Sequence, residues 1–319
     1  ENPKHIEVQI VGDRHGNMVH LFERDCSVQR RYQKVIEMAP SLGLKNATLQ
    51  QLYNHALTIC RSVNYNNIGT VEFLLDERQN IYFIEVNPRI QVEHTVTEEI
   101  TGIDLVKTQI YIADNKCLHE HLGYPVQNEI RKVGFAIQCR ITTEDPQNDF
   151  KPDYGIIQTY RSAAGLGIRL DAGNVHTDAR ISPFFDSMLV KVSAHSWRLE
   201  GAINKMIRAL KEFRVRGVKT NMQFLLNLLR TEELKNGTVT VNFIKEHPEL
   251  FDYKIGKDSA TRMLQYVGEV TVNGNPDVKV KDPTRKFHKP QVPEFEADKE
   301  PKPGTKQLLD KLGPEGFVD

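Results

Sequence analysis

The alternation of apolar and polar residues predicts a β-hairpin at the start of the chain. Residues 5–11 and 18–24 both alternate, and the turn-rich segment 12–17 separates them. One face of the first strand is apolar, and the opposite face carries three polar residues, His5, Glu7 and Gln9. We therefore expect a sheet whose polar face either meets water or forms the floor of a cleft.

Further hydrophobic periodicities along the chain predict both helices and strands, and therefore an α+β fold. Thr48 and Gln51 have the spacing of a capping box, which predicts the start of a helix near Thr48. A second hairpin is expected at 70–75 and 81–87. The other predicted elements are strands at 131–142, 154–170 and 186–194 and helices at 102–114, 198–213 and 222–230, the last with Asn221 as its N-cap.

The last part of the chain has a different composition. It changes after about residue 255, and residues 275–303 hold six of the fifteen prolines, which predicts a linker. The final 16 residues regain a short helical pattern. The chain opens at Glu1 without a starting methionine, so we expect a piece of a longer protein.

Composition excludes several classes of protein. The 42 Lys and Arg residues balance 42 Asp and Glu residues, which argues against a nucleic-acid binder. No apolar run approaches the ~18 residues of a membrane span. Four scattered cysteines predict free thiols in a reducing compartment, with Cys60 and Cys139 in the core. The segment His119–His121 is interpreted as a solvated loop rather than a metal site.

A pair of carboxylates stands out in the second hairpin. If residues 76 and 81 close its turn, Glu72 faces Glu85 at a side-chain distance of about 5 Å, with Leu74 and Phe83 on the same face. Two such carboxylates repel each other unless a cation neutralises them. Mg²⁺ or Mn²⁺ fits these oxygens, and Asn87 adds a third ligand. The alternative is a solvated pair on an exposed sheet.

The polar row continues beyond this pair. In an extended chain, Asn87, Arg89, Gln91 and Glu93 project from one face. Arg89 could hold a small planar oxyanion with its two-pronged guanidinium, and Glu93 could act on that anion as a general base. The alternative is the polar edge of a strand.

Residues 24–34 contain four basic side chains in eleven positions. Such a cluster is most often a solvated patch, but it is also typical of phosphate binding. A predicted Mg²⁺ site in the same domain favours a nucleoside triphosphate as the ligand.

Several segments in the same order resemble the biotin carboxylase branch of the ATP-grasp enzymes. They are residues 5–9, 23–31, 69–73, 83–94, 139–141, 182–187 and 216–221. The resemblance covers residues 1 to about 250. It implies the C-terminal lobe of an ATP-grasp domain, an antiparallel sheet with helices, over 1–115, and the biotin carboxylase C-terminal α+β domain over 116–250. Residues 251–319 would form a linker and the start of the following central region.

The segments after residue 250 indicate which kind of biotin-dependent carboxylase the chain resembles. Residues 266–276 and 304–316 are similar to the segment that follows biotin carboxylase in the pyruvate carboxylases, which acyl-CoA carboxylases lack. The implied activity is ATP- and bicarbonate-dependent carboxylation of protein-bound biotin, which then converts pyruvate to oxaloacetate. Two alternatives stay open. One is the biotin carboxylase of an acyl-CoA enzyme, and the other is a non-catalytic assembly or regulatory module.

The resemblance also implies roles for individual residues. It places ATP near His5, Gln29, Tyr32, Lys34, Glu72 and Glu85, and Mg²⁺ or Mn²⁺ on Glu72, Glu85 and Asn87. The resemblance implies that bicarbonate binds to Lys34, Arg89, Gln91, Val92 and Glu93. It also implies that Glu93 is the general base and that Arg140 stabilises the biotin enolate. Tyr32 stands where the family commonly has His. A tyrosine can still donate a hydrogen bond, but it carries no charge at neutral pH.

Partners follow from the same resemblance. It implies a biotin carrier domain and a carboxyltransferase domain in the same polypeptide, and a homotetramer built partly through biotin carboxylase dimers. Acetyl-CoA or another small molecule is an expected effector. The expected location is the cytoplasm, or the mitochondrial matrix in a eukaryote.

Overall fold

The computed structural model describes residues 2–124, 126–173, 175–253 and 259–274. Two compact units divide the chain, Glu1–Ile255 and Gly256–Asp319. In the second unit the described residues form one helix, α8 (Ser259–Asn273). The predicted linker and the predicted short helix at the end of the chain lie outside the described residues. No helix in the described ranges is long and apolar enough to cross a membrane.

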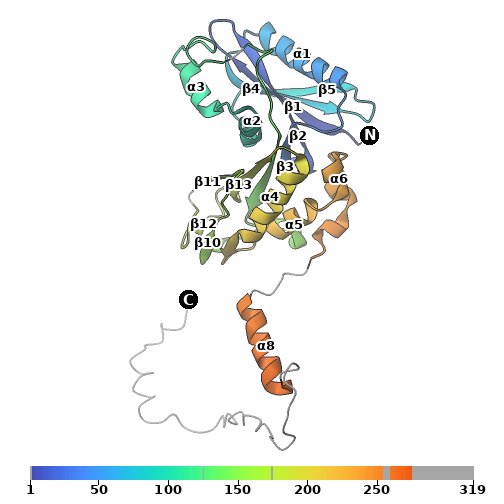
Figure 1. The fold of residues 1–319 in the computed structure, drawn as a ribbon, viewed down its shortest axis with the longest axis vertical. Helices are drawn as coiled ribbons and strands as arrows, with labels where there is room; N and C mark the ends of the chain where they lie inside the picture. The colour runs from blue at the N-terminus through green and yellow to red at the C-terminus, as the bar shows by residue number, and fades with distance from the viewer. Residues whose placement is uncertain (1, 125, 174, 254–258, 275–319) are drawn as a thin grey trace, which may run out of the picture. The chain divides into compact units, whose positions relative to one another are not determined.

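The first unit is built on one eight-stranded sheet (Figure 1). Its strand order is β11-β13-β6-β3-β2-β1-β4-β5, and every neighbouring pair is antiparallel. The strands are β1 (Lys4–Gly12), β2 (Met18–Arg30), β3 (Gln33–Ala39), β4 (Asn67–Leu75), β5 (Ile81–Asn87), β6 (Phe135–Thr142), β11 (Ile168–Ala172) and β13 (Met188–Ser196). Because β3 pairs with β6, strands from the first and second halves of this unit share one sheet.

Smaller elements complete the unit. Three two-stranded sheets form from β7 (Glu144–Asp145) with β8 (Lys151–Pro152), β9 (Gly155–Ile156) with β12 (Arg180–Ile181), and β10 (Thr159–Arg161) with β14 (Arg214–Arg216). The helices are α1 (Asn46–Ser62), α2 (His94–Thr101), α3 (Leu105–Ala113), α4 (Leu199–Glu212), α5 (Met222–Leu228), α6 (Glu232–Asn236) and α7 (Phe243–Glu246), with short 3₁₀ turns at Pro146–Asn148 and Pro248–Phe251.

Two helices cover the apolar sides of the sheet. The buried stripe of α1 packs against the apolar face of β1, where Ile6, Val8 and Ile10 are fully buried. The stripe of α4 packs against β6 and β13. Cys60 and Cys139 lie in these two cores as predicted, and all four cysteines are free thiols.

Local signals placed some element ends wrongly. The helix α1 begins at Asn46 and not at Thr48, and the Thr48 hydroxyl donates to Gln79 instead of forming a capping box. Asn221 is the N-cap residue of α5 as predicted, but its side chain does not cap the helix: it accepts from the backbone N–H of Thr142 and donates to the carbonyl of Arg140. In both cases a tertiary partner competes with the local cap.

Three predicted elements are divided or shortened. The helix expected at 102–114 is preceded by α2, whose C-cap residue Gly102 is in a left-handed conformation (φ 71°), and it starts only at Leu105. The strand expected at 154–170 is broken into β9, β10 and the start of β11. The strand expected at 131–142 begins at Phe135.

Glycines of positive φ offer a test of the fold. Gly217 has φ +96°, and a Cβ there would lie 2.1 Å from the carbonyl oxygen of Ile156, whereas Gly16 has φ +89° and open space. We expect Gly16→Ala to cost about 1–2 kcal/mol through backbone strain alone, and Gly217→Ala about 3–5 kcal/mol because a steric clash is added. Urea unfolding of both variants measures the difference, and equal losses would contradict the close approach.

Candidate functional site

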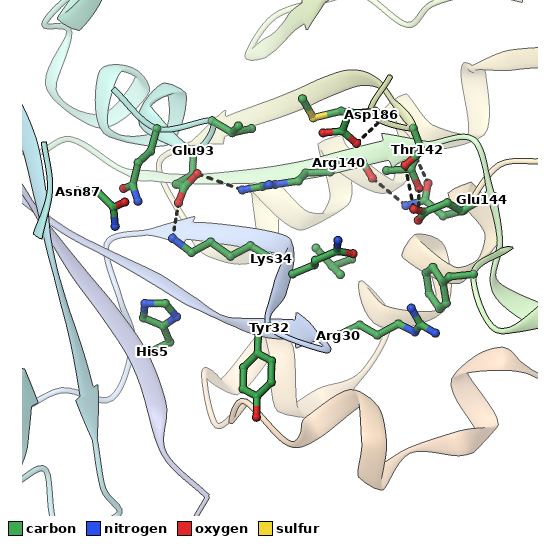
Figure 2. Close-up of a pocket in the computed structure, with 18 of the residues that line it drawn as sticks. His5, Arg30, Tyr32, Lys34, Asn87, Glu93, Arg140, Thr142, Glu144 and Asp186 are labelled. Carbon is green, nitrogen blue, oxygen red and sulfur yellow. Dashed lines mark hydrogen bonds and ion pairs between the residues drawn. The ribbon is translucent and has the colours of Figure 1, made fainter. Parts of the chain in front are cut away.

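A pocket of about 410 Å³ opens between β3, β5, β6 and the segment that follows β5 (Figure 2). It brings together the predicted site residues from five separate parts of the chain. Those that line it are His5, Tyr32, Lys34, Glu72, Glu85, Asn87, Arg89, Gln91, Val92, Glu93 and Arg140. Gln29 is the predicted residue that does not line it; its amide contacts the His5 ring at 2.5 Å.

Lys34 on β3 lies at the centre of a buried ion network. Its ammonium group is 2.6 Å from Glu7 Oε2 and 3.2 Å from Glu72 Oε1, and it also contacts Glu93. Burial opposes the charged form of Lys34. The neighbouring Cys26 and the three carboxylates outweigh burial and raise the pKa of Lys34. Lys34 is therefore a permanent cation on the wall of the pocket.

The polar face of β1 forms the floor of this network, which decides between the two possibilities left by the sequence. His5, Glu7 and Gln9 are only 8%, 0% and 1% exposed. Glu7 accepts from Lys34 and from the Arg24 guanidinium. Burial alone would raise the pKa of Glu7, but Arg24 and Lys34 lower it to about 2.

Arg24 corrects the prediction made for the basic cluster at 24–34. Its side chain is fully buried. Besides Glu7 it donates to four neutral oxygens, on Gln9, Thr70, Gln91 and Thr97. Arg24 therefore supports the pocket from below and does not reach a phosphate. Arg30 does line the pocket, while both Arg30 and Arg31 bond Asp149.

The predicted carboxylate pair is present. Glu72 of β4 lies directly opposite Glu85 of β5. A register shift directly after Glu72 pairs Phe73 with Phe83, so the predicted register beyond the carboxylates, with Leu74 and Phe83 in one row, is wrong by one residue. The pocket thus receives two facing carboxylates from an antiparallel pair.

An amide group lies between these carboxylates. The Asn87 Nδ2 atom is 3.0 Å from Glu72 Oε1 and 2.9 Å from Glu85 Oε1. The Asn87 N–H groups thus donate to both carboxylates at the position where a cation would neutralise their charges. Two carboxylates and the Asn87 amide oxygen are the ligand types that Mg²⁺ or Mn²⁺ takes. The donor set therefore fits a hard divalent cation.

The segment after β5 is not an extended strand, which corrects the predicted single row. The strand ends at Asn87, and Glu93 is the N-cap of α2. Arg89 is exposed, whereas Gln91 and Glu93 are 5% and 2% exposed. Gln91 accepts from Arg24 and donates to Glu72 at 2.7 Å. The predicted side chains therefore line one pocket, but a turn brings them there and not an extended strand.

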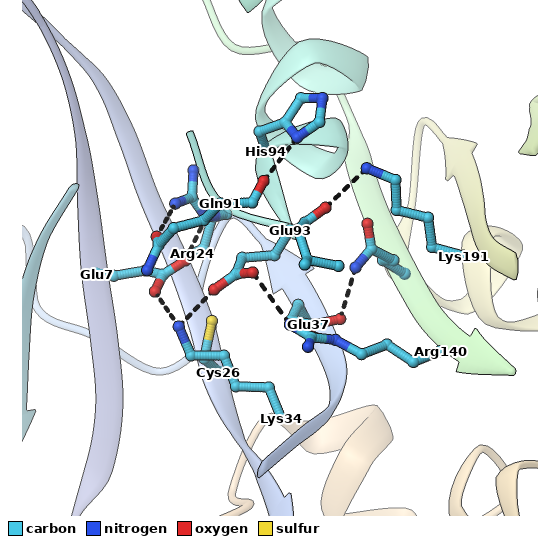
Figure 3. A network of polar contacts seen from close by, with 12 residues as sticks. Glu7, Arg24, Cys26, Lys34, Glu37, Gln91, Glu93, His94, Arg140 and Lys191 are labelled. Atoms are coloured by element: carbon cyan, nitrogen blue, oxygen red, sulfur yellow. Dashed lines mark hydrogen bonds and ion pairs between the residues drawn. The ribbon is translucent and has the colours of Figure 1, made fainter. Parts of the chain in front are cut away.

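Glu93 is held from two sides by cations. One carboxylate oxygen contacts Lys34, and the other is 3.0 Å from the Arg140 guanidinium. Arg140 is itself fixed by Glu37, whose Oε1 accepts from Arg140 Nε at 2.6 Å. The base candidate therefore lies between two groups that also attract anions (Figure 3).

Sequence reasoning missed several supporting residues. Glu37 lies three positions after Lys34, and Gln138 lies two positions before Arg140. Glu37 accepts from both Arg140 and Gln138. The polar positions within otherwise apolar strands were the available signal, but they do not identify a partner from another strand.

Tyr32 lies at the rim of the pocket. It is 97% exposed in the turn between β2 and β3, with φ 65°. A second pocket of about 470 Å³ shares Arg30 and Tyr32 with the first and is lined in part by Ile244 and Phe251. The turn at Tyr32 therefore separates a charged pocket from a more apolar one.

A group in the loop after α3 lies outside the pocket. Cys117, Glu120 and His121 bring their ligand atoms within 4.8 Å of one another, and Glu120 and His121 are exposed. His119 instead bonds the carbonyl of Tyr124 at 2.8 Å. Of residues 119–121, Glu120 and His121 therefore come together with Cys117, and His119 does not join them.

The lowered pKa of Glu7 gives a pH-dependent prediction. A carboxylate whose folded pKa is about 2, against an ordinary value of 4.5, stabilises the fold above pH 4.5 and loses this contribution as the pH falls towards 2. We expect Glu7→Gln to cost about 3 kcal/mol at pH 6.5 and much less at pH 3.

Urea unfolding across this pH range measures the effect. Glu77→Gln, at an exposed turn, is the matched control and should leave the stability unchanged at every pH. A Glu7→Gln penalty that stays constant from pH 6.5 to pH 3 would contradict the ion network.

Two family models match most of the first unit. The ATP-binding domain of the carbamoyl-phosphate synthase L chain matches residues 1–121, and the biotin carboxylase C-terminal domain matches residues 138–246. Pyruvate carboxylase of Staphylococcus aureus is 51% identical over all of this chain, and the human mitochondrial pyruvate carboxylase is 49% identical. The chain spans 28% and 27% of the lengths of these two relatives.

Solved structures agree with these relatives. A pyruvate carboxylase of Rhizobium etli with acetyl coenzyme A is 50% identical, with a TM-score of 0.80 over 99% of this chain and 32% of that chain. The biotin carboxylase domain of a Hydrogenobacter thermophilus 2-oxoglutarate carboxylase, in complex with MgADP and bicarbonate, is 42% identical. Its TM-score is 0.76, over 80% of this chain and 55% of that one.

Proposed function

The chain belongs to the biotin carboxylase family, and we propose that it activates bicarbonate with ATP and carboxylates biotin within a pyruvate carboxylase. The observation that carries this proposal is the position of Glu93. Its carboxylate lies between Lys34 and Arg140, in a pocket that also contains Arg89 and Gln91. The two cations beside Glu93 can attract an anionic substrate to it, so Glu93 is suited to act as a base on that anion. The facing carboxylates Glu72 and Glu85 can hold a metal ion, which would bind the phosphate that the anion attacks.

The first step is deprotonation of bicarbonate. Arg89 and the Val92 backbone N–H would hold the anion, and Glu93 would remove its proton. A bicarbonate oxygen then attacks the γ-phosphate of ATP, the bond to the β-phosphate bridge breaks, and carboxyphosphate and ADP form. Negative charge develops on the transferred phosphoryl group, and Lys34 is the permanent cation on the pocket wall that can stabilise it.

The second step transfers carbon dioxide to biotin. Carboxyphosphate breaks into CO₂ and phosphate, and phosphate removes the proton of the biotin ureido nitrogen. The resulting enolate oxygen would be stabilised by Arg140, which Glu37 holds in place. The nitrogen then attacks CO₂ and forms carboxybiotin.

Glu72, Glu85 and Asn87 would hold Mg²⁺ or Mn²⁺. The cation, when bound, neutralises charge on the ATP phosphates. His5 bridges Glu72 and Gln29, and Gln29 lines the second pocket, so both residues would lie beside the nucleotide. Tyr32 would donate one hydrogen bond at the rim, and the neighbouring more apolar pocket suits the purine base.

The rest of the enzyme would lie elsewhere in the polypeptide. We place the C-terminal lobe of the ATP-grasp domain at 1–115, the biotin carboxylase C-terminal domain at 116–250, and a linker with the start of the next region at 251–319. A biotin carrier and a carboxyltransferase domain would use the carboxybiotin to convert pyruvate to oxaloacetate. A homotetramer, regulation by acetyl-CoA, and a cytoplasmic or matrix location belong to the same proposal.

Identity over the full chain favours pyruvate as the acceptor. The pyruvate carboxylases match all of this chain at about 50%, including the segment that follows the biotin carboxylase domain. Assays of the full-length protein with pyruvate, 2-oxoglutarate and acyl-CoAs separate the possible acceptors. Absence of bicarbonate-dependent ATP cleavage would favour the non-catalytic alternative.

Glu93→Gln in the full-length protein tests the base. The amide keeps the shape of the side chain but cannot accept a proton. We expect bicarbonate-dependent ATP cleavage to fall by ~10²-fold or more while ADP affinity stays unchanged. Glu77→Gln is the surface control. A Glu93→Gln enzyme with parental turnover would remove Glu93 from this role.

Glu85→Gln tests the metal ligands. One negative charge is lost from the pair that faces the cation, so more metal is needed to occupy the site. We expect the Mg²⁺ concentration for half-maximal ATP cleavage to rise by at least ~10-fold, with activity restored at high Mg²⁺. An unchanged Mg²⁺ dependence would exclude Glu85 from the metal site.

A further inference from the structure

Within the part of the chain that the structure describes, the segment between β5 and α2 pairs with no strand, although it carries the residues assigned to bicarbonate. The strand β5 ends at Asn87, and α2 begins at His94. Peptide groups in such a segment are free to rotate unless their polar atoms are bonded. Two carbonyl groups in the segment, those of Gln91 and Val92, are held by the side chains of His94, the first residue of α2, and of Lys191 on β13 (Figure 3).

His94 holds the first of these carbonyls. Its ring Nδ1 is 2.7 Å from the Gln91 oxygen, and its backbone N–H donates to the same oxygen at 3.3 Å. A carbonyl only accepts hydrogen bonds, so Nδ1 carries the hydrogen. The His94 side chain is buried, and burial together with the Lys191 charge lowers the pKa of His94. The neutral ring is thus a fixed donor.

This contact determines the direction of the Val92 N–H. The Gln91 carbonyl and the Val92 N–H belong to one planar trans peptide, so they point in opposite directions. Val92 lines the pocket. By holding the carbonyl, His94 fixes the donor that the proposed function assigns to bicarbonate.

Lys191 holds the second carbonyl. Its ammonium group is 2.9 Å from the Val92 oxygen. Lys191 is on β13, directly opposite Arg140 of β6 and Asp171 of β11. Lys191 and Arg140 are paired across the sheet, so the register that brings Arg140 to the Glu93 carboxylate also brings Lys191 to the peptide group between Val92 and Glu93.

We propose that His94 and Lys191 are positioning residues that clamp the Gln91 and Val92 carbonyls and so orient the Val92 N–H and the Glu93 carboxylate for bicarbonate. Neither side chain touches the anion. The inference rests on the proposed function, because it assigns these groups to the same bicarbonate site.

Matched pairs of variants in the full-length protein test the clamp. His94→Phe keeps a ring without a donor, whereas His94→Asn keeps an N–H close to the position of Nδ1. Lys191→Met keeps the aliphatic stem without the charge, whereas Lys191→Arg keeps a donor. We expect the KM for bicarbonate to rise ~10-fold in His94→Phe and Lys191→Met, and to stay within ~3-fold of the parent in His94→Asn and Lys191→Arg.

The KM for ATP separates positioning from a general structural role. It should stay within ~2-fold of the parent in all four variants. Equal losses in the donor and donor-free variants, or a KM for ATP that rises as much as the KM for bicarbonate, would overturn the inference. If a donor-free variant has no turnover, retained ADP affinity supports the clamp and lost ADP affinity contradicts it.

Failure of the inference can be told apart from failure of the proposed function. A parent protein without bicarbonate-dependent ATP cleavage contradicts the function itself. An active parent whose His94→Phe and Lys191→Met variants keep the parental KM for bicarbonate contradicts only the clamp.

Discussion

Two cations, Arg24 and Lys34, lie on either side of the Glu7 carboxylate beneath the pocket, and the site is built on this arrangement. Arg24 and Glu7 are fully buried, so water does not solvate their charges. Burying charges in this way costs several kcal/mol per ion, which the mutual attraction roughly repays. The network therefore contributes little net stability but strongly disfavours any structure in which one member lacks its partner.

This constraint extends outwards to the functional groups. Lys34 connects Glu7 to Glu72 and Glu93, and Gln91 connects Arg24 to Glu72. Glu72, which is proposed to bind the metal, and Glu93, the candidate base, are thereby attached to one buried centre. Their relative positions depend on the sheet, which carries Lys34 and Glu72, and on the turn after β5, which carries Glu93. Preorganisation of this kind places charges before the substrate arrives, so little reorganisation is needed during reaction.

The sequence predicted most of the sheet and most of the residues that line the pocket, because strand alternation and carboxylate spacing are local signals. The register of Glu72 and Glu85 followed from counting across one hairpin. The register shift after Glu72, the start of α2 and the buried position of Arg24 depend on contacts between distant segments, which no local pattern encodes. For the same reason Glu37 could not be recognised, since its partner Arg140 is on a different strand.

In the proposed function, the pocket holds bicarbonate for direct attack on the γ-phosphate of ATP. Cleavage of ATP by the full-length protein in ¹⁸O-labelled bicarbonate tests it most directly, with the product phosphate analysed by mass spectrometry. Attack by bicarbonate transfers one labelled oxygen to each phosphate that forms. Phosphate that acquires its new oxygen from water alone would rule out attack by bicarbonate on ATP.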